Sequence, residues 1–143
     1  MVDTLEGMFV RDAMPKASPP TTILLDAPLP DILDTVADSR RHLFPVIDAR
    51  GELQGVILFD DIRLFFTERN LPRQAVVAQD LLTPNLVTVH PDEDLMSALR
   101  KFRETVQVEL VVVERENPRR VVGILSRRDV LSTYQDRVQR RSV

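Results

Sequence analysis

The amino-acid sequence predicts an α/β (α+β) fold built from two copies of a β-α-β-β-α unit. The second half of the chain repeats the first, and each copy alternates short apolar runs with amphipathic stretches. A length of 143 residues allows one domain, or two small domains that share a core. The absence of cysteine excludes disulfides, thiolate nucleophiles and cysteine-ligated metals. Because no apolar run approaches the roughly 20 residues of a membrane span and the acidic N-terminus does not resemble a signal peptide, we expect a soluble, cytoplasmic protein.

Four segments carry the internal repeat and divide the chain into two predicted domains, residues 10–69 and 76–139. Thr22-Ile23, for example, returns in the second copy as Thr88-Val89. The other matching pairs are Val10–Pro15 with Ala78–Pro84, Leu43–Asp48 with Glu109–Glu114, and Gly55–Asp61 with Gly123–Asp129.

Each copy opens with an extended stretch and a helix. The extended stretches are Thr22–Leu25 and Leu86–Val89. Apolar residues at a helical period then predict one buried helix face in each copy. The face contains Leu29, Ile32, Leu33 and Val36 in the first copy, and Leu95, Leu99, Phe102 and Val106 in the second.

Each copy closes with two strands and a second helix. The apolar runs Phe44–Ile47 and Leu110–Val113 have the length and the β-branched composition of buried strands. Turn-forming residues follow at 48–51 and 115–118, and another apolar strand then leads into a helix. The predicted helices run from Asp60 to about Arg69 and from Ser126 to about Val138.

These motifs resemble a tandem pair of cystathionine-β-synthase-type (CBS) domains, the Bateman module. The resemblance is carried by Met14-Pro15 and Leu82-Thr83-Pro84, Thr88–Asp92, Phe44–Asp48 and above all Gly123–Asp129. It covers residues 10 to 138 and implies two pseudo-twofold-related repeats that pack through their sheets, with a cleft for adenine nucleotides. The segments Asp60–Arg63, Val77–Leu82 and Val121–Tyr134 also resemble the cytosolic C-terminal region of bacterial voltage-gated chloride channels of the CLC family.

The start of the last helix contains the strongest candidate for a phosphate site. Ser126 stands where a strand ends and a helix begins, and the unpaired amides of a helix start favour an anion. Arg127 and Arg128 add positive charge there. The resemblance implies that the hydroxyl of Ser126 meets phosphate and that Asp129 meets ribose. A capping box explains Ser-x-x-Asp equally well, and the two roles are compatible.

The adenine end of the site is implied by the resemblance alone. Its walls would come from Val87 and Thr88 with Leu110 and Val111, although all four are also plausible core residues. A weaker second site in the first copy would use Asp61, Thr22, Phe44 and Pro45.

The first copy departs from the pattern at its helix start. Leu58 replaces the serine, and two carboxylates, Asp60 and Asp61, stand there without a base. Since each negative charge near a phosphate costs about 1 kcal/mol or more, this site should be empty or accept only a nucleoside.

An enzymatic function gains little support from the sequence. His42 and His90 are far apart along the chain and lack metal-ligand spacing, and no glycine-rich phosphate loop exists. The acidic runs at residues 60–61 and 92–94 are typical of helix starts. We therefore expect neither catalysis nor a metal site.

Two further alternatives concern binding partners. Eight arginines after Glu114 could contact nucleic acid, but a single tyrosine, no tryptophan and a net charge of −3 disfavour this. We expect instead a regulatory adenine-nucleotide sensor for AMP, ADP or ATP, either part of a chloride channel or chloride/proton antiporter or a free-standing protein. It would form a homodimer through the helices after Asp60 and Ser126, using Phe65, Phe66, Val130, Leu131 and Tyr134.

Overall fold

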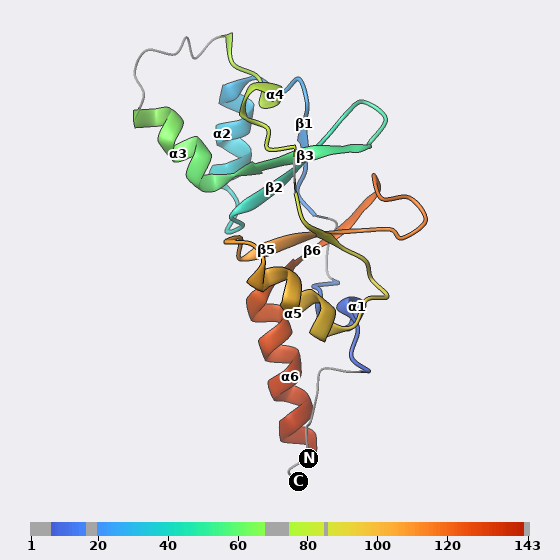
Figure 1. Cartoon of the computed structure of the whole chain (residues 1–143). Coiled ribbons are helices and arrows are strands. Elements are labelled where there is room, and N and C mark those ends of the chain that lie inside the picture. The colour runs from blue at the N-terminus through green and yellow to red at the C-terminus, as the bar shows by residue number, and fades with distance from the viewer. Residues whose placement is uncertain (1–6, 17–19, 68–74, 85, 142–143) are drawn as a thin grey trace. The chain divides into compact units, whose positions relative to one another are not determined.

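The computed structural model describes residues 7–16, 20–67, 75–84 and 86–141. The chain divides into two compact units (Figure 1). One contains Thr21–Leu86, and the other combines Met1–Pro20 with Val87–Val143. Within the described residues, no helix combines the length and the apolar character that are needed to cross a lipid bilayer.

The unit Thr21–Leu86 contains a three-stranded sheet in the order β1-β2-β3. β1 pairs with β2 in parallel, and β2 pairs with β3 antiparallel. A buried cluster that includes Ile32, Phe44 and Ile57 joins the sheet to its helices. The elements are β1 (Ile23–Leu24), α2 (Leu29–Ala37), β2 (Leu43–Ile47), β3 (Leu53–Leu58), α3 (Phe59–Thr67) and α4 (Ala78–Leu81).

The other unit repeats this arrangement with a sheet in the order β4-β5-β6, again one parallel and one antiparallel pair. Its core cluster includes Phe102, Leu110 and Leu125. The elements are α1 (Val10–Ala13), β4 (Thr88–Val89), α5 (Leu95–Arg103), β5 (Glu109–Val113), β6 (Val121–Ser126) and α6 (Arg127–Arg141). The predicted α/β class and the order β-α-β-β-α in each copy are therefore confirmed.

The predicted apolar face of α5 is correct at Leu95 and Phe102, which are fully buried, but wrong at Val106, which is fully exposed. The helix ends at Arg103, where the amide of Glu104 bonds back to Arg100 and Lys101. The Thr105 hydroxyl then accepts a hydrogen bond from the amide of Gln107 at 3.2 Å. This local bond competes with helix continuation, and Val106 lies in a bend between α5 and β5.

Each of the short helices α1 and α4 packs against the core of the other sequence repeat, an arrangement that we call the exchange of α1 and α4. Although α1 opens the first copy in the sequence, its amide at Val10 donates to the Glu93 carbonyl at 2.9 Å, and Val10 lies in the core with Phe102. α4 opens the second copy, yet the Ala78 amide donates to the Ala27 carbonyl at 2.9 Å. Each short helix therefore completes the core of the other repeat.

The repeated glycine in β3 and β6 allows close approach of the segment after each short helix. A Cβ atom on Gly55 would lie 2.6 Å from the carbonyl oxygen of Thr83, and a Cβ on Gly123 would collide with Met14. Thr83 and Val56 exchange two backbone hydrogen bonds, at 2.8 and 3.1 Å. This packing explains why the glycine and the Met-Pro or Leu-Thr-Pro segment recur together in the sequence.

Candidate functional site

The strongest predicted site residues lie where β6 passes directly into α6. β6 ends at Ser126, which pairs with Glu109 of β5, and α6 begins at the next residue. The Ser126 amide donates to Oδ2 of Asp129 at 2.9 Å, and the Asp129 amide donates to Oγ of Ser126 at 2.9 Å. The two residues thus form a reciprocal capping box, as one of the two sequence interpretations predicted.

This capping box leaves chemistry available for a ligand. The Ser126 hydroxyl accepts with a lone pair, so its hydrogen remains able to donate to a phosphate oxygen. A carboxylate has about four acceptor positions, and the bond from Ser126 occupies one at Asp129. Both side chains are half-buried at the positive end of a 15-residue helix. The pair can therefore hold the helix start and also contact a phosphate and a hydroxyl.

The two arginines after Ser126 differ in their surroundings. The Arg127 guanidinium donates to the Phe102 carbonyl at 3.0 Å and lies 5.7 Å from the centre of the Phe102 ring. It therefore ties the end of α5 to the start of α6 and neutralises helix carbonyls there. Arg128 is exposed. Of the two, Arg128 has the greater freedom to reach a phosphate.

The four residues predicted as adenine walls do not share one face of the sheet. Thr88 and Val111 are register partners in the parallel pair β4–β5, so their side chains leave the sheet on the same side. Leu110 points to the opposite side, into the core cluster with Phe102, and Val87 packs against that cluster. Thr88 is half-buried and can present its side chain to a ligand, whereas Val111, on the same face, and Leu110, on the opposite face, are both fully buried.

The start of α3 differs from that of α6, as the sequence predicts. The backbone contact is common to both, because the amide of Phe59 donates to the His42 carbonyl at 2.8 Å and the amide of Arg127 to the Val108 carbonyl at 3.0 Å. At α3, the rings of His42 and Phe59 also meet edge to face at 6.4 Å. Because Leu58 has no hydroxyl, a reciprocal capping box with Asp61 is impossible. Asp60 and Asp61 occupy the first turn, where their negative charges interact favourably with the helix dipole and would repel a phosphate.

The residues predicted as walls of the weaker site also lie on opposite faces of their sheet. Phe44 is fully buried in the core cluster of its unit, and Pro45, the next residue of β2, leaves the sheet on the opposite side. Thr22 is half-buried immediately before β1.

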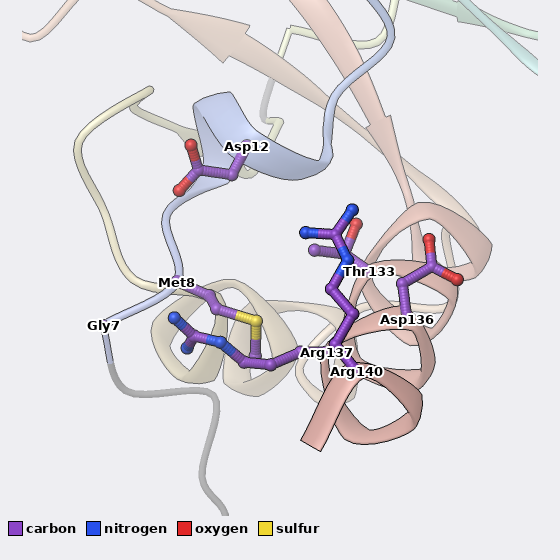
Figure 2. Close-up of a pocket in the computed structure, with 7 residues that line it drawn as sticks. All are labelled: Gly7, Met8, Asp12, Thr133, Asp136, Arg137 and Arg140. Atoms are coloured by element: carbon purple, nitrogen blue, oxygen red, sulfur yellow. The ribbon is translucent and has the colours of Figure 1, made fainter. Parts of the chain in front are cut away.

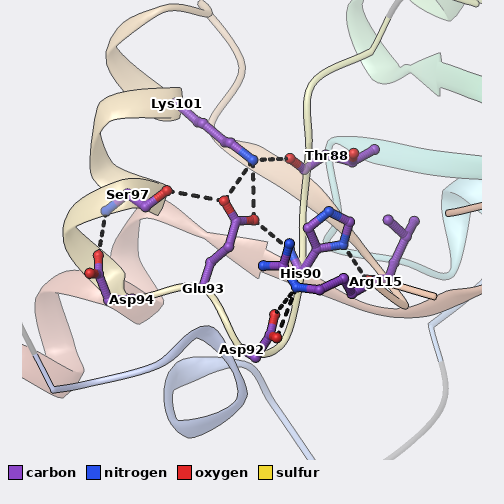
Figure 3. A network of polar contacts seen from close by, with 9 residues as sticks. Thr88, His90, Asp92, Glu93, Asp94, Ser97, Lys101 and Arg115 are labelled. Atoms are coloured by element: carbon purple, nitrogen blue, oxygen red, sulfur yellow. Dashed lines mark hydrogen bonds and ion pairs between the residues drawn. The ribbon is translucent and has the colours of Figure 1, made fainter. Parts of the chain in front are cut away.

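A charged network that the sequence analysis missed follows β4 (Figure 3). Lys101 pairs with Glu93 at 2.8 Å and donates to the Thr88 carbonyl at 2.8 Å. Burial raises the pKa of Glu93, whereas hydrogen bonds from Lys101, the His90 amide and Ser97 lower it. The hydrogen bonds together outweigh burial, so the pKa lies below the ordinary value of 4.5. Glu93 is therefore a charged, nearly buried carboxylate that accepts hydrogen bonds from three different residues.

An exposed ion pair lies beside this network. Nε of Arg115 donates to both carboxylate oxygens of Asp92, at 2.9 and 2.8 Å. This hydrogen bond holds the pKa of Asp92 below its ordinary value and raises that of Arg115. The acidic run 92–94 is thus engaged by Arg115, Lys101 and the start of α5, and among the residues that the structure describes no group of three metal-ligating side chains is close enough to hold a metal ion.

Four arginines in the described part of the C-terminal third lie near carboxylates. Arg115 pairs with Asp92, and Arg120 pairs with Glu114 at 3.4 Å. Arg137 and Arg140 line a hollow of about 620 Å³ between α6 and the segment around Met8 (Figure 2). Its other lining residues are Gly7, Asp12, Thr133 and Asp136, so two aspartates balance the two arginines. This charge balance disfavours a nucleic-acid surface.

Two more observations bear on the helices predicted to form a dimer. Val130 is fully buried in the core of its own unit and Tyr134 packs against that core, so the prediction that Val130 contacts a partner is wrong. Leu131 is 50% exposed and remains available. The side chains of Phe65 and Phe66 lie outside the described part of the chain.

A buried amide oxygen is the second feature that sequence reasoning missed. Oε1 of Gln107 is inaccessible to solvent and has no hydrogen-bond partner in the described part of the chain. Gln107 precedes Val108, whose carbonyl accepts from the amide of Arg127 at 3.0 Å, so it lies in the segment that contacts the start of α6. An unsatisfied buried acceptor reduces the free energy of unfolding.

Comparison with known proteins identifies relatives with the same architecture. A CBS domain-containing protein from Dictyostelium discoideum is 29% identical over 119 residues, which cover 77% of this chain and 81% of the relative. The crystal structure of CBSX2 from Arabidopsis thaliana in complex with AMP superposes with a TM-score of 0.79 and 26% identity, covering 92% of this chain and 99% of that one.

A second solved structure agrees in fold. The CBS domain of a bacterial CNNM/CorC family Mg²⁺ transporter in complex with ATP has a TM-score of 0.73 and 22% identity, covering 92% of this chain and 89% of that one. Residues 10–68 and 77–136 each match the CBS domain family. The chain, with its two β-α-β-β-α copies, belongs to the CBS domain family as a tandem pair.

Proposed function

We propose that this CBS pair is a regulatory module that binds an adenine nucleotide at the start of α6 and performs no catalysis. The main support for this proposal is the Ser126–Asp129 pair, which offers a hydroxyl donor and a carboxylate acceptor at a helix start. Arg128 supplies positive charge beside it, and the half-buried Thr88 offers a side chain to the base, on the face of the sheet that it shares with the buried Val111. The AMP complex of the similar CBSX2 supports adenosine monophosphate as the first ligand to test.

Isothermal titration calorimetry of the full chain tests this proposal. We expect saturable binding of AMP, ADP or ATP at micromolar concentrations, and no binding of the corresponding guanine nucleotides. Adenosine should bind more weakly than AMP, because it lacks the phosphate that Ser126, the helix amides and Arg128 would contact. Equal affinity for adenosine and AMP would contradict a phosphate site at this helix start.

The regulated partner is a second, finer part of the proposal. The resemblance of residues 121–134 to chloride-channel tails supports a role at the cytosolic face of a chloride channel or chloride/proton antiporter. A free-standing sensor of another protein is the alternative. Ligand binding transmits a signal only if the two conformations of the module differ in affinity. The sequence encoded upstream distinguishes the two, since a transporter requires about ten or more apolar spans there.

We also propose a homodimer through the helices that follow Asp60 and Ser126. Within α6, the exposed Leu131 supports this interface, while Val130 and Tyr134 belong to the core. Analytical ultracentrifugation of the full chain and of Leu131→Glu tests it, with Ser132→Glu, also exposed on α6, as the matched control. A dimer that survives Leu131→Glu would contradict the α6 part of the interface.

A further inference from the structure

The strand that carries Thr88 is too short to be rigid by itself. β4 contains two residues and stands at the edge of the sheet β4-β5-β6, so it is paired on one side within that sheet. A two-residue edge strand gains little from backbone pairing and frays easily. A ligand wall on β4 therefore requires additional contacts to hold its position.

Lys101 and Glu93 supply those contacts at both ends of β4. From the last turn of α5, Nζ of Lys101 donates to the carbonyl of Thr88 at 2.8 Å, immediately before Val89. On the other side, Oε2 of Glu93 accepts the amide of His90 at 2.6 Å. The ammonium and the carboxylate also pair directly, which closes a clamp from Thr88 to His90 around the strand (Figure 3).

The surrounding groups fix the clamp in place. Ser97 donates its hydroxyl to Oε1 of Glu93 at 3.0 Å, which sets the orientation of the carboxylate. Nδ1 of His90 lies 3.1 Å from the Val113 carbonyl, and because a carbonyl only accepts, this ring nitrogen is the donor. The Glu93 and Lys101 side chains are 12% and 29% exposed. Partly desolvated charge pairs interact more strongly than exposed ones.

The first repeat lacks the clamp. At its matching positions, in the register that aligns Thr22 with Thr88, Thr35 stands in place of Lys101, Ala27 in place of Glu93 and Leu24 in place of His90. The Thr35 hydroxyl donates to the carbonyl of Asp31 in its own helix. The clamp is therefore confined to the repeat that also contains the Ser126–Asp129 pair.

We infer that Lys101 and Glu93 are positioning residues that hold β4 at Thr88 in the geometry required by the nucleotide. This inference rests on the proposed function, and it adds two residues that touch no ligand themselves. It also gives a second reason why the second repeat, rather than the first, would bind nucleotide: a preorganised wall avoids the ordering cost of binding.

Substitutions at the two residues separate positioning from simple stabilisation. Lys101→Met removes the bond to Thr88 and leaves the Glu93 carboxylate without its cation, so both stability and AMP affinity should fall. The double variant Lys101→Met/Glu93→Gln removes the unpaired charge as well, while the glutamine can still accept from His90 and Ser97. Its thermal stability should therefore recover toward that of the wild type, but AMP affinity should stay about tenfold lower, because the Thr88 tether is still missing.

Asp94→Ala is the matched control. Asp94 caps α5 by accepting the amide of Ser97 at 2.8 Å, so its loss destabilises the same helix without removing the Lys101 bond to Thr88. AMP affinity should change less than about threefold in this variant at temperatures where it is folded.

The measurements are calorimetric titration with AMP, thermal unfolding, and amide hydrogen exchange at Val89 and His90 in all variants. The inference is overturned if AMP affinity returns together with stability in the double variant, or if Asp94→Ala lowers affinity as much as Lys101→Met. If the wild type does not bind AMP, the proposed function fails and the ligand role of the clamp fails with it. Exchange then decides the remaining claim: unchanged protection in Lys101→Met would show that Lys101 does not hold β4.

Discussion

Ser126 and Asp129 each donate a backbone amide to the side chain of the other, with both hydrogen bonds at 2.9 Å across the first turn of α6. The pair that we propose to contact phosphate and ribose is therefore already oriented by the helix start. A ligand would find these two side chains in defined rotamers, and it would add contacts to a cap that exists without it.

Asp129→Ala should affect both ligand binding and folding. Loss of the carboxylate that we propose to contact ribose should abolish nucleotide binding. Because Asp129 accepts the amide of Ser126, we expect the substitution also to cost about 1 kcal/mol of unfolding free energy. Urea unfolding measures the stability, and calorimetry with AMP measures the binding.

Asp80→Ala provides the matched control for this variant. Asp80 accepts the amide of Val77 at 2.9 Å at the start of α4, which is the same kind of bond at a helix that carries no proposed ligand contact. It should lose a similar amount of stability and keep its AMP affinity. Equal AMP affinity in Asp129→Ala and the wild type would refute the assignment of Asp129 to the site.

The wild-type chain should bind one phosphorylated nucleotide, at the second repeat. The first turn of α3 presents Asp60 and Asp61 and follows Leu58, so it lacks a hydroxyl and a base. The double substitution Leu58→Ser/Asp60→Arg should raise the calorimetric stoichiometry from one nucleotide per chain toward two, because it restores both groups. Two AMP molecules bound to the unmodified chain would contradict the predicted asymmetry.

Gln107→Leu should stabilise the protein in the absence of ligand. The substitution removes a buried oxygen that has no partner among the described residues, a gain of about 1 kcal/mol in unfolding free energy. If a bound nucleotide donates to that oxygen, the same variant should bind AMP more weakly. Thermal unfolding with and without saturating AMP measures both effects, and a destabilised ligand-free variant would show that the oxygen is satisfied in solution.

Acid should weaken the clamp on β4. The pKa of Glu93 is lower in the folded protein than the ordinary value of 4.5, so its charged form stabilises the fold above that pH. This stabilisation should be lost as the pH falls through the folded pKa, below about 4.5. The Lys101→Met/Glu93→Gln variant should lose less stability than the wild type in urea unfolding between about pH 6 and pH 3. Parallel acid losses in the two proteins would assign the effect to other carboxylates, such as Asp92.

The repeat made most of the fold predictable from the sequence. Strands such as Phe44–Ile47 and Leu110–Val113 are short, apolar and β-branched, and the structure places them in β2 and β5. Apolar spacing on α2 and α5 predicted which helix faces are buried, because the core requires it. The packing of one repeat's sheet on the other, implied by the family resemblance, stays a prediction.

Other features depend on side-chain geometry that residue spacing does not determine. Just after α5 ends, the amide of Gln107 donates to the Thr105 hydroxyl, and Val106 is exposed, although the apolar period continues through that residue. The last turn of α5 packs beside β4, and this brings Lys101 into contact with Glu93 and Thr88. No short sequence motif predicts that contact. At Ser126, the observed bonds confirm the capping box, and the ligand role of the same tetrapeptide stays a prediction.

The exchange of α1 and α4 has a practical consequence for dissecting the protein. A fragment that begins at residue 76 would leave behind Met8 and Val10, which are buried in the core with Phe102 and Leu110. Such a half would expose the cavity that these side chains fill, and it would misrepresent the affinity of the intact chain. An autonomous half-molecule is better obtained by circular permutation, with residues 7–16 joined by a linker behind the end of α6 or ahead of β4.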